Sequence, residues 1–353
     1  MSVTRRGFLA ASALAGCSRR PSEPGCASLA GKSIRWIVPF SAGGGYEMLS
    51  RLLEPHLEQS LGAEILIVNE PGNGGIVGAS KLRDALPDGR TLGILNSAGL
   101  FAAAMTGSGG YPDPARDFSI LGRLGRTQPV LFTAASSSIR SIEDLAAPKR
   151  SGGLLASVTG LGSNNFLTVS SVESILGLRF DYIAGYAGSR DEMLALLRGE
   201  VDLSSGNFES NQAGFEQGEI RPLLQVSDKP ITEHPSFRNV PCLGGPNGWA
   251  ARRAAALGQD VPAAEAAAAA LISLYTPGIL AAAPRLPSEL AACLSDRFLD
   301  AASSPALAAA AKTTRRTLEI ATGKQALQDL AAASRNITRF APVVRAAFER
   351  VRR

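Results

Sequence analysis

Signals for strands and helices alternate along this chain, and glycine-rich turns separate them. The β-branched run Ile34–Val38 is typical of a strand and ends at Pro39. Gly43 to Gly45 follow, and the next leucines recur at helical spacing on one face: Leu49, Leu52, Leu53 and Leu57. A strand, a glycine turn and a helix in this order predict an α/β fold with a mostly parallel, doubly wound sheet.

The same alternation continues along the chain. Further strands are expected at 65–68, 91–95, 130–134, 153–157, 180–184, 202–204 and 221–226. Further helices are expected at 78–85, 164–176, 189–198 and 263–275, and one that opens at 141–145. Asn96–Gly99 is expected to be a loop, and helices should dominate from Pro287 to Arg353.

The length of 353 residues and 45% apolar content suffice for two domains with cores of their own. The alanine-rich C-terminal helices need a sheet to pack on, so we expect the chain to return to its first lobe. This predicts a discontinuous first lobe (32–127 plus 246–353), a second lobe (128–245) and a cleft between them. The two crossings, at Arg126–Pro129 and Gly244–Pro246, are the expected hinges.

The N-terminal segment has the pattern of an export signal. Residues 1–16 place Arg5 and Arg6 before an apolar stretch of about ten residues, whereas a membrane span needs roughly twenty. The twin arginine is similar to a Tat signal, and the Sec route stays open. Leu14–Cys17 looks like a lipobox, so Cys17 would carry the lipid anchor of a periplasmic protein and 17–31 would be a tether. A chance cysteine is the alternative.

Charge and cysteine content argue against several classes of protein. The 36 basic and 31 acidic residues are scattered and only 6% are aromatic, so no nucleic-acid partner is expected. Cys26, Cys242 and Cys293 are widely spaced, and only His56 and His234 could join them, so no metal is expected. An oxidising compartment permits one disulfide, but the sequence leaves its pair open, and free thiols are the alternative.

Pro39–Gly45 stands where an open α/β sheet binds ligands, beyond a strand and at the amino end of a helix. Free backbone N–H groups at such a position favour an anion, although the glycines could merely make the turn. The chain completes neither a G-x-G-x-x-G nor a G-x-x-x-x-G-K-[ST] motif, and no cofactor is expected.

A set of ordered motifs over residues 32–245 resembles the Bug family, the receptors of tripartite tricarboxylate transporters. In the first motif Glu47 replaces the usual Asp, and from Pro246 onward the match is looser. The matching segments are Pro39–Arg51, Asn69–Gly75, Pro87–Leu92, Asp117–Arg123, Gly199–Asp202 and Asn239–Pro241.

The resemblance implies a periplasmic binding protein of type II, a Venus flytrap with two doubly wound α/β lobes joined by two crossings. It also implies a monomeric receptor that captures a small carboxylate in the interlobe cleft, passes it to transporter membrane subunits and catalyses nothing. Carried over by position, the first-lobe contacts would be Phe40, Ser41, Ala42, Gly43, Gly44, Ser97 and Ala98. The second-lobe contacts would be Thr159, Gly160, Leu161, Gly162, Ser163, Asn164, Tyr186, Ala187 and Gly188.

Two positions depart from the family pattern: Phe166 stands where members often have His, and Ala187 where they have a basic residue. These departures leave the ligand open, and a neutral compound is one alternative. Asn207, after a predicted strand, is a further candidate contact.

Structural roles compete with several binding roles. Ser163 and Asn164 could simply cap a helix, and Tyr186 could be a core aromatic. We expect Glu47 to favour the helix start and to pair with Arg51 at i+4.

Two other functions remain as alternatives, a ligand-sensing receptor for a signalling system and a secreted hydrolase. For a hydrolase the chain lacks a G-x-S-x-G elbow, and His56 and His234 lie in ordinary surroundings. Asp191 and Glu192 are expected on a helix surface, with no second acid placed opposite them.

Overall fold

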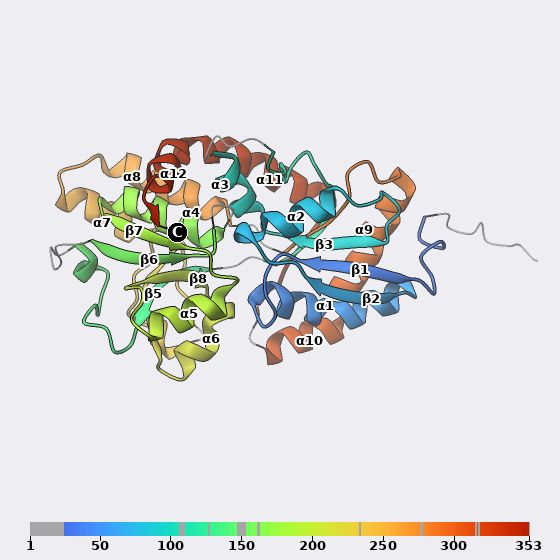
Figure 1. Cartoon of the computed structure of the whole chain (residues 1–353), viewed down its shortest axis with the longest axis horizontal. Helices are drawn as coiled ribbons and strands as arrows, with labels where there is room; N and C mark the ends of the chain where they lie inside the picture. Colours follow the sequence, from blue (N-terminus) through green and yellow to red (C-terminus); the bar gives the residue numbers. More distant parts are fainter. Residues whose placement is uncertain are drawn as a thin grey trace, which may run out of the picture.

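The computed structural model describes residues 25–105, 110–125, 128–146, 153–160, 163–232, 234–275, 278–314, 316 and 318–352. The predicted signal peptide and Cys17 lie outside these residues. The same holds for Arg126 in the predicted first crossing and for Leu161 and Gly162 in a predicted ligand loop. Figure 1 shows two α/β lobes arranged along the longest axis of the molecule.

The described strands belong to sheets in both lobes. They are β1 (Ser33–Val38), β2 (Glu64–Asn69), β3 (Thr91–Leu95), β4 (Ser119–Gly125), β5 (Pro129–Ala134), β6 (Leu154–Val158), β7 (Phe180–Ala184), β8 (Ser204–Asn207), β9 (Ile220–Gln225), β10 (Ile279–Ala282), β11 (Leu318–Thr322) and β12 (Val351–Arg352).

The described α-helices cover the faces of the sheets. They are α1 (Gly45–Leu61), α2 (Ile76–Arg83), α3 (Ser97–Met105), α4 (Asn164–Leu176), α5 (Ser189–Leu197), α6 (Phe208–Glu216), α7 (Trp249–Ala256), α8 (Val261–Ser273), α9 (Ser288–Ala302), α10 (Pro305–Thr313), α11 (Gly323–Ile337) and α12 (Ala341–Phe348). Short 3-10 helices lie at Asn73–Gly75, Glu143–Ala146, Pro235–Phe237 and Thr338–Phe340.

The first lobe is built on one sheet of strand order β11-β4-β10-β3-β1-β2. β1 pairs in parallel with β2 and β3, whereas β10 runs antiparallel to β3 and β4, and β11 antiparallel to β4. Because β10 and β11 come from the C-terminal part of the chain, this lobe is discontinuous in sequence. Trp36, Leu53 and Phe298 belong to a core that one face of the sheet forms with α1 and α9.

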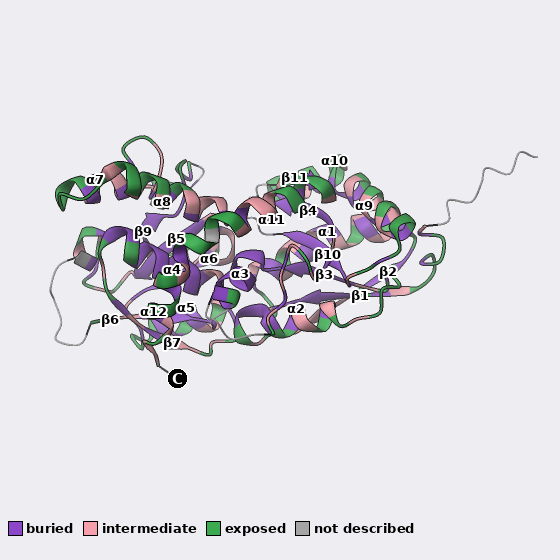
Figure 2. Cartoon of the chain, turned by 90° about the horizontal axis from the view of Figure 1, so that it is seen from above, coloured by how far each residue is buried: buried purple, intermediate pink, exposed green. Residues whose placement is uncertain are grey.

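The second lobe contains two three-stranded sheets, β12-β7-β6 and β8-β5-β9. A parallel bridge between Ala156 and Leu203 joins β6 to the residue before β8, which brings the two sheets edge to edge. β5 runs antiparallel to both of its neighbours, whereas β6, β7 and β12 are parallel. Buried strands run through the middle of both lobes, between helices with exposed outer faces (Figure 2).

The return to the first lobe comes later in the chain than predicted. α7 and α8 pack against α4 of the second lobe, where Ala268 and Leu271 are buried. Gly244 at the predicted second crossing is bonded within the second lobe, because its N–H donates to the Ser227 carbonyl at 3.1 Å. The chain crosses between Tyr275, which is bonded to Thr168 of α4, and Ile279 of β10.

The C-terminal residues also differ from the prediction, which gave all of 246–353 to the first lobe. β12 pairs in parallel with β7 of the second lobe and fills an edge that would otherwise expose unpaired backbone groups. Arg350 donates to Glu173 at 2.5 Å, and Glu173 in turn accepts from Tyr182. α11 contacts both β4 and α8, so this segment spans the two lobes.

Helix boundaries follow the expected local signals in most places. Gly62 follows α1 and Gly177 follows α4 as C-cap residues, both at positive φ, a conformation that glycine adopts without strain. The predicted loop at Asn96–Gly99 is wrong, because α3 begins at Ser97. The Asn96 side chain accepts from the Gly99 N–H at 3.2 Å and so caps that helix. The predicted strand at 202–204 lies later, at β8, and α6 was not predicted.

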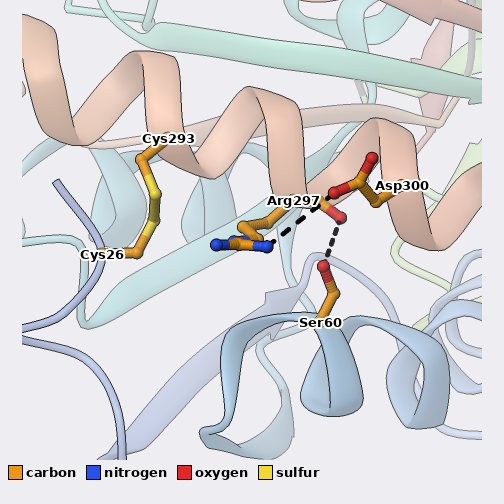
Figure 3. Close-up of a disulfide and its surroundings, with 5 residues drawn as sticks. All are labelled: Cys26, Ser60, Cys293, Arg297 and Asp300. Atoms are coloured by element: carbon orange, nitrogen blue, oxygen red, sulfur yellow. Dashed lines mark hydrogen bonds and ion pairs between the residues drawn. A yellow bond between two sulfur atoms is a disulfide. The ribbon is translucent and has the colours of Figure 1, made fainter. Parts of the chain in front are cut away.

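A disulfide between Cys26 and Cys293 ties the segment before β1 to α9, with Cα atoms 5.8 Å apart (Figure 3). Cys242 is free. Beside the disulfide, the Ser60 hydroxyl donates to the Arg297 carbonyl at 3.1 Å and connects α1 with the same helix. The structure thus selects one pair from the three cysteines that the sequence left open.

Replacing both Cys26 and Cys293 with serine should lower the free energy of unfolding by about 2–4 kcal/mol, because the disulfide restricts the unfolded chain. The measurement is guanidinium unfolding of the oxidised protein. Cys242→Ser is the matched control and should leave the midpoint nearly unchanged. Equal midpoints for the double variant and the wild type would contradict the pairing.

Candidate ligand-binding cleft

A pocket of about 70 Å³ lies where loops of the two lobes meet. Its lining is dominated by small and neutral polar residues and includes one carboxyl side chain. The lining residues are Phe40, Ser41, Gly44, Gly45, Tyr46, Thr159, Ser163, Asn164, Asn165, Gly188, Ser189, Glu192, Ser205, Gly206, Asn207 and Ser210.

Four helices, one from the first lobe and three from the second, begin at this pocket. Their N-cap residues all line it: Gly44 of α1, Ser163 of α4, Gly188 of α5 and Asn207 of α6. The first N–H groups of a helix have no partner within the helix, and its amino end carries a partial positive charge. Convergence of four such ends makes the pocket suitable for an anion.

Side chains cap only one of these four helices. Ser163 Oγ accepts from the Phe166 N–H at 3.1 Å, which confirms the capping role considered for Ser163. Gly44, Gly188 and Asn207 make no side-chain cap. A ligand could therefore occupy the place that a capping oxygen takes at other helices.

A hydrogen-bonded chain crosses the pocket from one lobe to the other. Asn164 Nδ2 donates to the Tyr46 hydroxyl at 3.1 Å, and that hydroxyl donates to Asn96 Oδ1 at 3.3 Å. Burial raises the pKa of Tyr46, so it stays a neutral donor. Asn164 Oδ1 and Ser205 Oγ are buried pocket atoms that have no partner in the described part of the chain. Such atoms favour a ligand that hydrogen-bonds to them.

Glycines allow the lobes to approach closely at three places beside the pocket. A Cβ atom on Gly45 would lie 2.0 Å from Ser210 Oγ, and one on Gly188 would lie 2.4 Å from Ser41 Oγ. A Cβ atom on Gly160 would lie 2.9 Å from the backbone of Asn73. Each contact joins one lobe to the other, so the structure is a closed form of the cleft.

The one carboxyl group in the lining belongs to Glu192, in the first turn of α5. Its side chain is buried, with the residue 3% exposed, and it accepts a hydrogen bond from Asn165 Nδ2. Burial raises the pKa of Glu192 well above its ordinary value, and the hydrogen bond from Asn165 lowers it in part. The expectation that Glu192 lies on a helix surface is wrong, because that face of α5 packs against β6 and the pocket.

The structure brings eight of the predicted contact residues together in the pocket. They are Phe40, Ser41, Gly44, Thr159, Ser163, Asn164, Gly188 and Asn207. The other described candidates do not line it: Ala42, Gly43, Ser97, Ala98, Gly160, Tyr186 and Ala187.

Five of these absences have a structural reason. Ala42 and Gly43 are exposed at the turn before α1, where the Gly43 N–H donates to Glu47 Oε2 at 2.5 Å. Ser97 and Ala98 are buried within α3. Tyr186 packs beside the core cluster of β5, as the alternative reading of a core aromatic proposed.

Sequence reasoning missed the remaining lining residues: Gly45, Tyr46, Asn165, Ser189, Glu192, Ser205, Gly206 and Ser210. Helical spacing could have identified two of them. Glu192 stands one turn after Ser189, so both lie on the same face of α5 as the N-cap. Tyr46 is a third, because it follows the turn residues Gly44 and Gly45 directly.

Other polar residues have structural roles. Glu47 pairs with Arg51 at 3.4 Å, which confirms that expectation. His234 is buried against Phe208 and Phe237. Within the described residues, no group of three or more His, Cys, Asp or Glu side chains could hold a metal, and none of the helices is long and apolar enough to cross a membrane.

Comparisons with known proteins identify relatives of this chain. The sequence model of the tripartite tricarboxylate transporter family receptor matches residues 49–257. A UPF0065 protein from the tcbD-tcbE intergenic region of Pseudomonas sp. (strain P51) is 27% identical over 247 residues, covering 68% of this chain and 71% of the relative.

Two solved structures share the fold. MatC from Rhodopseudomonas palustris with bound malate has a TM-score of 0.69 at 18% identity, covering 89% of this chain and 99% of MatC. A second R. palustris protein, solved with adipate, has a TM-score of 0.68 at 22% identity, covering 90% of this chain and 97% of that protein. The predicted fold of a two-lobed periplasmic binding protein is thereby confirmed.

Gly45→Ala should hinder closure, because its methyl group would overlap Ser210 Oγ across the cleft. Such overpacking costs about 1–3 kcal/mol, which shifts the closure equilibrium roughly tenfold toward the open form. Small-angle X-ray scattering should report a larger radius of gyration. Adding Ser210→Ala, which removes the overlapping oxygen, should restore the wild-type value, and Ser210→Ala alone is the control. A Gly45→Ala profile identical to wild type would refute this account of closure.

Proposed function

Because the chain belongs to the tripartite tricarboxylate transporter receptor family, we propose that its interlobe pocket captures a small carboxylate for a transporter of this type. The convergence of four helix amino ends on one pocket is the observation that carries the proposal. Carboxylate oxygens accept hydrogen bonds from free N–H groups, and the helix dipoles stabilise the negative charge.

Neutral groups alone can hold such an anion. None of the described lining residues is Lys, Arg or His. Burying a cationic side chain would require its desolvation to be offset by near-ideal geometry, whereas backbone N–H groups at helix ends are already oriented. Tyr46, Asn164 and Ser163 would add side-chain contacts from both lobes.

The ligands of two structural neighbours agree with this class of compound. MatC was solved with malate and the second R. palustris protein with adipate, and both ligands are small dicarboxylates. Adipate is the longer molecule, so ligands of this class differ in length. The pocket of about 70 Å³ in the present closed form would have to widen for a ligand of that length.

In this proposal the ligand closes the lobes by bridging them. The chain passes between lobes from Gly125 of β4 to Pro129 of β5 and again from Tyr275 to Ile279 of β10, and these two passages are the proposed hinges. It passes a third time along α11 and α12, between β11 of the first lobe and β12 of the second. Transporter membrane subunits would recognise the closed form. The receptor would bind and release its ligand unchanged, as a monomer without catalytic activity.

The proposed location is the periplasm, with a lipid on Cys17 as the membrane anchor. The tether predicted at 17–31 is too long, because Cys26 and Leu29 are buried in the first-lobe core. The part before Gly25 would tether the folded lobes, and the disulfide at Cys26 agrees with an oxidising compartment. Export by the Tat route is proposed from Arg5 and Arg6.

A thermal-shift screen of the mature protein against small mono-, di- and tricarboxylates should find a stabilising ligand. At about a hundred times its dissociation constant, the ligand should add roughly 2.7 kcal/mol to the free energy of unfolding. Gly44→Leu should abolish the shift, because its side chain would enter the cleft from an extended backbone that any residue can adopt. An unchanged melting temperature of ligand-free Gly44→Leu is the control. Absence of any shift, or consumption of the ligand, would refute the proposal.

Cys17→Ser should move the protein from the membrane fraction to the soluble periplasmic fraction, because a lipid anchor needs the thiol of this residue. The measurement is fractionation of cells that express the full-length chain, with labelling by a radioactive fatty acid. Cys242→Ser should remain lipidated and in the membrane fraction. Continued labelling of Cys17→Ser would show that the lipobox assignment is wrong.

A further inference from the structure

A third connection between the lobes is the C-terminal segment 323–352, hereafter the strap, which comprises α11, a 3-10 helix, α12 and β12. It follows β11 of the first-lobe sheet directly, and its last strand pairs with β7 of the second lobe. A sheet of each lobe therefore holds one end of the strap. A segment held at both ends restricts the movement of one lobe relative to the other.

A buried ion pair and close packing fix the strap to the first lobe. Arg123 of β4 is 4% exposed, and it donates to Glu319 Oε1 of β11 at 3.1 Å and to Asp329 of α11. Gly323 lies so close to β4 that a Cβ atom on it would be 2.5 Å from the Ile120 carbonyl oxygen. The start of the strap cannot lift from the sheet without leaving the buried arginine unpaired, which is costly.

The other end of the strap is attached to the second lobe by a side-chain network as well as by backbone pairing. Arg350 donates to Glu173 Oε1 of α4 at 2.5 Å, and its guanidinium lies 5.7 Å from the centre of the Tyr182 ring. The Tyr182 hydroxyl donates to Glu173 Oε2. Burial raises the pKa of Glu173, while the hydrogen bond from Tyr182 and the charge of Arg350 lower it in part.

Between its ends the strap packs against helices of both lobes. α11 buries Ala326, Leu330 and Ala333 in the core cluster that also includes α8 of the second lobe. α12 contacts α4 of the second lobe and α3, which follows β3 of the first lobe. Arg345 of α12 donates to the Met105 carbonyl of α3 at 2.8 Å. The strap is therefore a firmly packed element along its whole length.

The strap lies to one side of the two proposed hinges. Those hinges adjoin β4 and β10, which are neighbouring antiparallel strands, so they lie side by side at one end of the first-lobe sheet. α11 covers the face of this sheet that also carries α2 and α3, whereas α1 and α9 cover the opposite face. In Figure 1, α11 and α12 follow the upper side of the molecule, and α1, α5 and α6 the lower side.

This position decides which rotation of the lobes is possible. Two adjacent flexible connections allow rotation about the line that joins them, and a third connection beside that line resists any rotation that would lengthen it. Hydrogen bonds hold a helix at a rise of about 1.5 Å per residue, so α11 and α12 do not stretch. Separation is left to the side where Gly45 of α1 meets Ser210 of α6.

We propose that the strap limits how far the lobes open: it stays attached to both lobes throughout, acts as the pivot and confines their separation to the side of α1 and α6. The inference goes beyond ligand capture, because it concerns the width of the open form. A receptor with a narrow open form loses less freedom on closing, so less of the interaction free energy of its ligand is offset by closure.

Small-angle X-ray scattering of the ligand-free mature protein tests the proposal, because the radius of gyration rises as the lobes separate. A chain that ends at Glu349 lacks Arg350 and β12, so its strap is released from the second-lobe sheet. Its radius of gyration should exceed the wild-type value by about 1 Å in roughly 20 Å.

Two point variants assign the effect to the anchor. Arg350→Met keeps the backbone pairing of β12 and removes the ion pair, so it should give a smaller increase than the shortened chain. Glu173 then becomes a neutral acid that still bonds to Tyr182, because the charge that lowered its pKa is gone. Arg339→Ala removes an exposed arginine of the same strap and should leave the radius of gyration unchanged.

Equal radii of gyration for the wild type and the folded shortened chain would overturn the proposal, as would an equal increase in Arg339→Ala. If the shortened chain fails to fold, hydrogen–deuterium exchange of the ligand-free wild type decides. Amides of α12 and β12 should exchange within about tenfold of the rate of those in β7. Faster exchange would show that the strap detaches and limits nothing. None of these measurements uses a ligand, so a negative result leaves the proposed carboxylate receptor standing.

Discussion

The N–H groups in the first turn of each α-helix have no partner within the helix, and the architecture of this protein follows from where those groups point. β1, β6, β7 and β8 each lead into a helix, so that α1, α4, α5 and α6 all begin at the carboxyl edges of their strands. In an open α/β sheet this edge is where a ligand is bound. Two lobes that face each other across such edges enclose a pocket with positive partial charge on both sides, and none of its described lining residues has a basic side chain.

The approach of the two lobes depends on residues that lack side chains. Gly45 lies against Ser210, and Gly188 lies against Ser41, at distances that leave no room for a Cβ atom. Because closure brings backbone directly against side chains, the pocket has a small volume of about 70 Å³. The helix ends of both lobes therefore lie within reach of one small anion. α11 and the pairing of β12 with β7 join the C-terminal segment to both lobes, so the closed arrangement is more than a contact of two loops.

Local patterns predicted those parts of the fold that local physics decides. β3, α4 and β7 begin and end at the residues that periodicity indicated, because their hydrophobic spacing is regular and glycine ends α4 at Gly177. The error at Asn96 arose because an asparagine can make a loop or cap a helix, and only the buried apolar residues of α3 decide between them. The partner of Cys26, the late crossing after Tyr275 and the second-lobe position of β12 depend on contacts between distant segments, which no local pattern records.

In the candidate site, too, local sequence patterns predicted some features, whereas features that depend on contacts between distant segments were missed. Motif order located the helix starts at Gly44, Ser163 and Gly188, because glycine turns and caps are visible in sequence. The inward orientation of Glu192 could not be predicted from the sequence. An acidic residue in the first turn of a helix ordinarily faces solvent, where the helix dipole stabilises its charge. Packing turned it inward, where burial raises its pKa well above the ordinary value and so favours the neutral acid. A pocket gains specificity from such a group, because a ligand that leaves it unpaired loses more than one missing contact.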